Sequence, residues 1–172
     1  EFDNRKGYFG SHKNLTFTGT TFFNQGGTVR GLTDAQFQAQ NIVTAGGWLR
    51  SEQTLSLLLG NGLLDNSATN DFSAGLISAR TLAVEAGTLT NIGSNQADQG
   101  LRASTLDLNI HGIDNTRGLI HADHSLTLHG REHINNTHGK ISSGEILRIA
   151  DTRPSRLRRS HQSAARRSAH KT

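Results

Sequence analysis

The chain of 172 residues contains 33% hydrophobic and 5% aromatic residues, with 19 Gly, 1 Pro and no Cys. The lack of Cys excludes disulfide bonds and thiolate metal sites, and the small share of large apolar side chains predicts a thin core. The net charge of +4 arises at the end of the chain, because residues 153–172 hold seven of the 18 basic residues and none of the 14 acidic ones. The first residues carry neither Met nor a signal-peptide pattern, so we expect a segment of a longer polypeptide.

A repeat of 20 to 25 residues runs from residue 4 to about residue 150. Its units begin with Asn or Thr at positions 4, 24, 44, 66, 91, 115 and 136. In five units the third residue after this start is Gly. An apolar residue follows two positions after the Gly, a small residue four positions after it, and an apolar pair eight and ten positions after it. The predicted turn residues are Asn4, Asn24, Asn66, Asn115, Asn136, Gly7, Gly27, Gly47, Gly118 and Gly139.

Apolar residues two positions apart indicate strands with one buried face. Each unit offers two such strands, and stacking the units about 4.8 Å apart satisfies the backbone and forms a continuous core. The pattern predicts an all-β fold, a parallel β-helix of about seven coils, because another all-β fold such as a β-sandwich would not keep equivalent residues in register. The predicted core ladder is Leu15, Ala35, Leu55, Leu82, Leu106, Leu126 and Leu147, and a second ladder is Phe17, Phe37, Leu57, Val84, Leu108, Leu128 and Ile149.

The corners before each Gly are rich in Asp and Asn, as in Asp65-Asn66 and Asp114-Asn115. These residues hydrogen-bond to their own backbone and suit sharp turns, and stacked Asn side chains can bond from coil to coil. We predict that the Gly three residues after each Asn supplies a positive φ. Insertions at residues 68–71 and 95–98 fall beside this turn, where a loop disturbs the stack least.

The motif Asn-x-x-Gly-x-Ile-x-[Ser/Ala], then Leu-x-Leu, then Leu/Ile-[Asp/Asn]-Asn, resembles the haemagglutinin repeats of filamentous haemagglutinin-like two-partner-secretion exoproteins. The resemblance covers about residues 4–150 and is clearest in residues 118–139. It implies a right-handed parallel β-helix filament that is exported through an outer-membrane partner transporter and acts in adhesion. Contact-dependent inhibition proteins carry similar repeats. The secretion domain at the start of these exoproteins and a toxin-sized domain at their end are not recognisable in this sequence.

Catalysis on polysaccharides by a β-helix would need two or more carboxylates converging on one face. Asp3, Asp65 and Asp114 are accounted for as corner residues, and the other acids fall at scattered phases, so we predict no enzyme, no catalytic residues and no cofactor. Six of the nine His lie between His111 and His138. Their phases do not repeat from coil to coil, so we predict solvent-facing His and no metal site, with metal binding or a pH-dependent charge change as alternatives.

Four aromatic residues could serve as contacts for a sugar or a partner: Tyr8, Trp48 and the pair Phe22-Phe23. Trp48 stands next to an inward position and is expected to face outward, which makes it the predicted surface contact. Phe23 matches Leu64 and Ile134 just before the corner, so we predict that Phe23 belongs to the core.

The sequence divides into a haemagglutinin-repeat β-helix segment, residues 1–151, and a basic tail, residues 152–172, that we predict to be disordered. The tail has no aromatic residue to stack on bases, so we expect no specific nucleic-acid partner.

The resemblance implies a structural and adhesive shaft of a secreted or cell-surface bacterial adhesin. Its expected partners are a cell-surface receptor or glycan, the outer-membrane transporter, and further coils of the same polypeptide at both ends. Three alternatives remain: the stalk of a contact-dependent growth-inhibition toxin, a polysaccharide-acting enzyme, and a degenerate gene remnant. A downstream toxin domain with a cognate immunity gene would favour the stalk.

Overall fold

The computed structural model describes residues 1–151, and every regular element within them is a β-strand. None of these residues forms a helix of the length and apolarity needed to cross a membrane. The predicted tail, residues 152–172, lies outside the described residues. The strands are β1 (Phe2–Asp3), β2 (Tyr8–Ser11), β3 (Leu15–Thr18), β4 (Thr21–Phe23), β5 (Thr28–Gly31), β6 (Asp34–Gln38), β7 (Asn41–Val43), β8 (Trp48–Ser51), β9 (Thr54–Leu58), β10 (Leu63–Asp65), β11 (Leu76–Thr90), β12 (Gly100–Asp114), β13 (Leu119–Asn135), β14 (Lys140–Ser143) and β15 (Ile146–Asp151).

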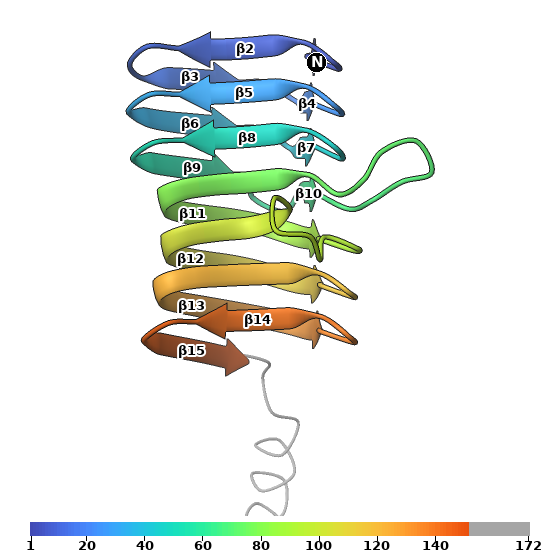
Figure 1. Ribbon diagram of the computed structural model, residues 1–172, viewed down its shortest axis with the longest axis vertical. Helices are drawn as coiled ribbons and strands as arrows, with labels where there is room; N and C mark the ends of the chain where they lie inside the picture. Colours follow the sequence, from blue (N-terminus) through green and yellow to red (C-terminus); the bar gives the residue numbers. More distant parts are fainter. Residues whose placement is uncertain (152–172) are drawn as a thin grey trace, which may run out of the picture.

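Stacked coils give the rod three faces, since most coils contribute three strand segments (Figure 1). The first face contains β2, β5, β8, the starts of β11, β12 and β13, and β14, which is one segment from each of seven coils. The second face contains β3, β6, β9, the middles of β11 to β13, and β15. The third face contains β1, β4, β7, β10 and the ends of β11 to β13. Only two strands per coil were predicted. The third was missed because β4, β7 and β10 are three residues long, too short to show a period.

The neighbouring strands are all parallel, and each pairs with the equivalent segment of the next coil. In Figure 1 the front strands run to the left and the chain returns to the right behind them as it descends from the N-terminus, which is a right-handed path. This is the hand that right-twisted strands favour in parallel connections. The prediction of a right-handed parallel β-helix of about seven coils is therefore confirmed.

The core ladder runs down the second face. Leu55 pairs with Leu82 and Leu82 with Leu106, and these side chains are at most 1% exposed. Burial holds from Leu15 to Leu126. Leu147 keeps the register by pairing with Leu126, but its side chain is 46% exposed, so it is not the buried core residue that the repeat predicts. The reason is geometric, because no described coil covers the lower side of β15.

The third face corrects the prediction for the phenylalanine pair. Phe22, not Phe23, stands in register with Ile42 and Leu64, and Phe22 is fully buried. Its ring contacts that of Phe17 in the same coil, with a centroid distance of 4.9 Å, and that of Phe37 in the next coil, with a centroid distance of 5.1 Å. Phe23 is half-buried, and the Arg5 guanidinium lies 5.6 Å from its ring centroid.

The turn before the first face also differs from the prediction. The positive φ belongs to the residue directly before the final Gly of each Asn-x-x-Gly unit, and not to that Gly itself. The residues with positive φ at this position are Lys6 (56°), Gly26 (65°), Gly46 (64°), Arg117 (51°) and His138 (53°). The final Gly is needed for space: a Cβ on Gly118 would collide with the Asn115 side chain and with the Asn91 carbonyl oxygen of the coil above.

Side chains of successive turns form a hydrogen-bonded row, here called the asparagine ladder. Most of its members are fully buried, and they also bond to carbonyl oxygens of the first face. The side-chain pairs are Asn4 to Asn24 (2.8 Å), Asn24 to Thr44 (3.1 Å), Asn66 to Asn91 (2.9 Å), Asn91 to Asn115 (2.7 Å) and Asn115 to Asn136 (2.8 Å). The corner Asp residues cap the same turns, since Asp65 Oδ1 accepts the backbone N–H of Ser67 and Asp114 Oδ1 that of Thr116.

The inserted loop at residues 66–75 folds back onto the stack. Thr69 N–H donates to the Phe72 carbonyl at 2.7 Å, which closes the loop on itself. The Phe72 ring then lies against Gly26 and Gly46, the positive-φ positions of two successive turns. Elsewhere the same position carries Lys6 or Arg117, so the two glycines leave the room that Phe72 fills.

Candidate functional site

Two exposed aromatic side chains share one outward row of the first face. Tyr8 pairs with Thr28 and Thr28 with Trp48, so the two aromatic residues stand two coils apart. Tyr8 is 68% exposed and Trp48 is 43% exposed, which places Trp48 outward as predicted from its position. The Tyr8 ring folds over Gly10, where a Cβ would meet its Cζ and Oη atoms. Tyr8 therefore presents a ring face to solvent, and we call this row the aromatic row.

Basic side chains occupy the next outward row of the same face. Arg30 pairs with Arg50 directly, and the row continues through Ser78 to Arg102. The Arg50 guanidinium lies 5.6 Å from the Trp48 ring centroid, within the range of a cation–π contact. Arg30 forms an ion pair with Glu52 at 3.0 Å, which neutralises part of this row.

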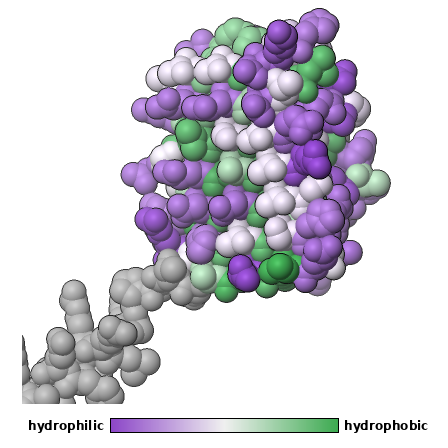
Figure 2. Space-filling model, turned by 90° about the vertical axis from the view of Figure 1, so that its left-hand side faces the viewer, coloured by the Kyte–Doolittle hydropathy of each residue, from purple (hydrophilic) through white to green (hydrophobic). Residues whose placement is uncertain are grey.

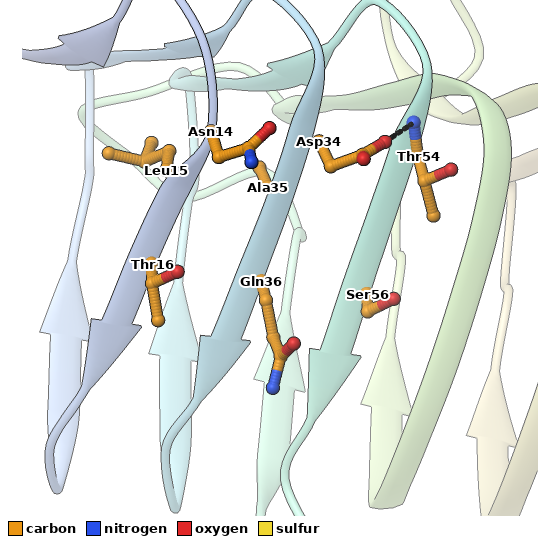
Figure 3. Close-up of a pocket in the computed structure, with 8 residues that line it drawn as sticks. All are labelled: Asn14, Leu15, Thr16, Asp34, Ala35, Gln36, Thr54 and Ser56. Atoms are coloured by element: carbon orange, nitrogen blue, oxygen red, sulfur yellow. Dashed lines mark hydrogen bonds between the residues drawn. The ribbon is translucent and has the colours of Figure 1, made fainter.

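The second face carries a shallow hollow of about 310 Å³ over the first three coils. Figure 3 shows its polar side chains in two rows, one from Asn14 to Thr54 and one from Thr16 to Ser56. Asp34 is its one charged residue, and Asp34 Oδ1 accepts the backbone N–H of Thr54 at 3.2 Å. The sequence repeat is defined by the residues that point inward. The outward residues that line this hollow vary from coil to coil, so the repeat could not reveal the site.

Histidine residues gather where β13 contains two bulges. The register of β12 and β13 shifts between Ala103 and Thr105 and again between Ile110 and Gly112. A bulge inserts an extra residue, bends the strand and changes the direction of nearby side chains. His121 Nδ1 lies 2.8 Å from Ser142 Oγ and its Nε2 lies 3.3 Å from Asp123, while His124 Nδ1 lies 3.1 Å from Glu145. No group of three metal-ligating side chains comes together within residues 1–151.

Three surface hollows are each lined by a single carboxylate. Asp34 lines the hollow on the second face, and Asp123 lines a hollow of about 240 Å³ on the first face. Glu85 lines a third hollow of about 330 Å³, together with His111 and Arg131. A glycosidase needs two carboxyl groups flanking the scissile bond. None of these three hollows brings two carboxylates together, so none of them offers the carboxyl pair of a glycosidase.

Asp3 is the carboxyl group with a clearly displaced pKa in the described range. The Arg5 side chain and the Arg5 backbone N–H both donate to it, and these hydrogen bonds lower its pKa from the ordinary 3.8 to about 2. Asp3 is a corner residue, and its hydrogen bonds to Arg5 stabilise the turn. The lowered pKa therefore has a structural cause.

The edge where the first and second faces meet is shown in Figure 2. Hydrophilic and near-neutral residues cover most of it, and hydrophobic residues appear in small separate areas. A surface of this kind offers hydrogen-bonding groups over its whole length and no broad apolar patch.

A scan against protein-family models matches the haemagglutinin repeat over residues 2–93 and 103–153, which is most of the chain. Comparison with curated proteins finds no match, and comparison with solved structures finds none either. The family match and the stacked, in-register coils agree, and the repeat of this family is a structural one. The chain belongs to the haemagglutinin-repeat family and is an adhesin-type repeat protein like the filamentous haemagglutinins.

Proposed function

We propose that this chain is a segment of the adhesive shaft of a secreted haemagglutinin-like adhesin and attaches to cells or surfaces. Proteins with this repeat are typically secreted or displayed at the cell surface. A stack of coils that hydrogen-bond only to their neighbours forms a stiff, extended rod. Such a rod carries its binding groups outward along its length, so attachment requires no enclosed cavity.

The aromatic row is the observation that carries the proposal. Ring faces of Tyr and Trp stack on the apolar faces of sugars and on partner side chains, and exposed Tyr and Trp are enriched where proteins bind partners. Tyr8 and Trp48 stand about 10 Å apart along the rod, which is two coil spacings. Arg30 and Arg50 beside them add hydrogen-bond donors for a hydroxyl or an acidic group.

Agglutination tests this proposal. Beads coated with the 172-residue chain are mixed with erythrocytes, because many copies on one bead raise a weak contact to a measurable one. Replacing both Tyr8 and Trp48 by Ser should reduce the agglutination titre about tenfold or more, given ~1 kcal/mol for each aromatic contact.

Leu58, which is 37% exposed on the second face, provides the matched control. Leu58→Ser removes a similar exposed apolar group and should leave the titre unchanged. Circular dichroism checks that all variants keep the β-helix. Equal agglutination by the double variant and the unaltered chain contradicts the role of the aromatic row, and no agglutination by any chain contradicts adhesion.

The partners of the shaft follow from the same proposal. Further coils of the same polypeptide would stack on both ends, since Ile146, Leu147 and Ile149 are 45 to 51% exposed on the last described coil. Unpaired backbone groups of an edge strand also favour such stacking. We propose in addition that an outer-membrane transporter exports the full-length protein, as the family resemblance implies. Secretion of the full-length protein only when such a transporter is co-expressed would support that step.

A further inference from the structure

The hollow on the second face forms a polar trough that the aromatic row does not touch. It is lined by three successive strands, β3, β6 and β9, which lie side by side on the rod. Six polar side chains line it, together with Leu15 and Ala35 (Figure 3). The six lining side chains are Asn14, Thr16, Asp34, Gln36, Thr54 and Ser56.

The trough is equipped to bind hydroxyl groups. Asn14 Oδ1 is held by the Thr33 hydroxyl at 2.6 Å, which fixes the orientation of the amide and leaves its NH₂ group available as a donor. Asp34 makes no ion pair within the described residues, and its hydrogen bond to Thr54 uses one of several acceptor sites on the carboxylate. A carboxylate of this kind can accept hydrogen bonds from two neighbouring hydroxyls of one sugar.

The spacing of the trough matches a chain-like ligand. Equivalent side chains recur at each coil, about 4.8 Å apart along the rod. This distance is close to the advance per sugar of an extended pyranose chain. A linear glycan lying along the rod would therefore meet one lining pair per sugar: Asn14 and Thr16, then Asp34 and Gln36, then Thr54 and Ser56.

Charge selects among the linear glycans. Asp34 is the one charged group of the trough, and it is negative. An acidic polysaccharide would be repelled there, whereas hydroxyls of an uncharged one can donate to the carboxylate. We propose that the trough binds an uncharged, linear polysaccharide parallel to the rod axis. The trough is separate from the aromatic row, so this binding goes beyond the proposed function.

Titration with defined oligosaccharides tests this site on the full 172-residue chain. The probes are unbranched glucose oligomers of one to six sugars in β-1,4 and β-1,3 linkage, followed by amide chemical shifts. Binding should strengthen up to three sugars and then level off, because the trough spans three coils. Asp34→Ala and Gln36→Ala should each weaken it about tenfold, while tri-galacturonate should bind more weakly than the neutral trimers.

Asp107→Ala is the matched control, because Asp107 is an exposed carboxylate in the same outward row as Gln36 but two coils beyond the trough. It should bind like the unaltered chain. Tyr8→Ser with Trp48→Ser should also leave this binding unchanged, which separates the trough from the adhesive role of the aromatic row. The proposal is overturned if no oligomer binds, if Asp34→Ala binds equally well, if tri-galacturonate binds as tightly, or if the aromatic variant abolishes binding.

Discussion

The Asn24 side-chain amide donates to the Thr44 hydroxyl at 3.1 Å, and the asparagine ladder stops at that bond. In the next coil Asn66 Oδ1 is buried and has no hydrogen-bond partner in the described residues. Every other member between Asn4 and Asn136 receives a side-chain bond from the coil before it. The shorter Thr44 side chain has no amide to extend to Asn66, so one substitution in the repeat leaves one unsatisfied acceptor.

Thr44→Asn should restore the ladder and stabilise the rod. An Asn at this position can donate to Asn66 Oδ1 and continue to accept from Asn24, and one buried hydrogen bond contributes about 1 kcal/mol. Denaturant unfolding should give a free energy of unfolding higher by about that amount. The reverse change, Asn91→Thr, makes a second break of the same kind and should lower stability by ~1–3 kcal/mol. If Thr44→Asn leaves the denaturant midpoint of unfolding unaltered, the missing hydrogen bond at Asn66 has no effect on stability.

The core ladder was predictable from the sequence, whereas the orientation of the phenylalanine pair was not. In-register stacking of Leu55, Leu82 and Leu106 follows from apolar spacing alone, because each inward position must meet its counterpart. The phase of Phe22 and Phe23 was misassigned, since a three-residue strand does not establish which of two adjacent apolar residues faces in.

Features that depend on contacts between coils were not predictable from one repeat. The polar trough is built from outward residues that differ in every unit, so no periodic signal marks it. The packing of Phe72 on Gly26 and Gly46 arises from an insertion that has no counterpart in other coils. The Trp48 contact, by contrast, was proposed from its place beside an inward residue, and its function stays a prediction.

The two kinds of turn glycine should respond differently to alanine. A Cβ at Gly118 would overlap the carbonyl oxygen of Asn91 in the coil above, although its φ is not positive. Gly60 has a φ of +57° but nothing within 4 Å of an added Cβ, so it isolates the backbone effect. Gly60→Ala should lower the free energy of unfolding by ~1–2 kcal/mol, and Gly118→Ala should lower it by more or prevent folding. Similar effects of both changes would refute the close-packing role of the final Gly.

Truncation of the core ladder should cost stability in the middle of the rod and little at its end. Leu106 is 1% exposed and Leu147 is 46% exposed, although both lie in the same ladder. Leu106→Ala should lower the free energy of unfolding by ~2–5 kcal/mol, because it removes buried methyl groups and leaves a cavity. Leu147→Ala should lower it by less than about 1 kcal/mol. A comparable loss for the two variants in urea unfolding would mean that Leu147 is covered in solution.

Asp3 should titrate well below an ordinary aspartate. Hydrogen bonds from Arg5 lower its pKa from 3.8 to about 2. A carboxyl group with a lowered pKa stabilises the fold above its unfolded pKa, and this contribution is lost as the pH falls toward 2. Carboxyl NMR signals should show a midpoint for Asp3 near 2, and Arg5→Gln should move it back toward 3.8. A midpoint near 3.8 in the unaltered chain would show that the Arg5 contact is absent in solution.

End-to-end association of the isolated chain is the last expectation, and it rests on the exposed apolar ends of the stack. Ile146, Leu147 and Ile149 lie on the final described coil, and Phe2 is 36% exposed on the first. Edge strands offer unpaired backbone groups, and a heterologous contact between two different ends forms open filaments rather than closed dimers. Analytical ultracentrifugation should therefore show species that grow with concentration. Leu147→Lys with Ile149→Lys should suppress them, because charge on an edge strand opposes pairing. Arg148→Lys, a neighbouring change that keeps the charge, should not, and a monodisperse monomer at all concentrations would contradict the stacking of further coils on these ends.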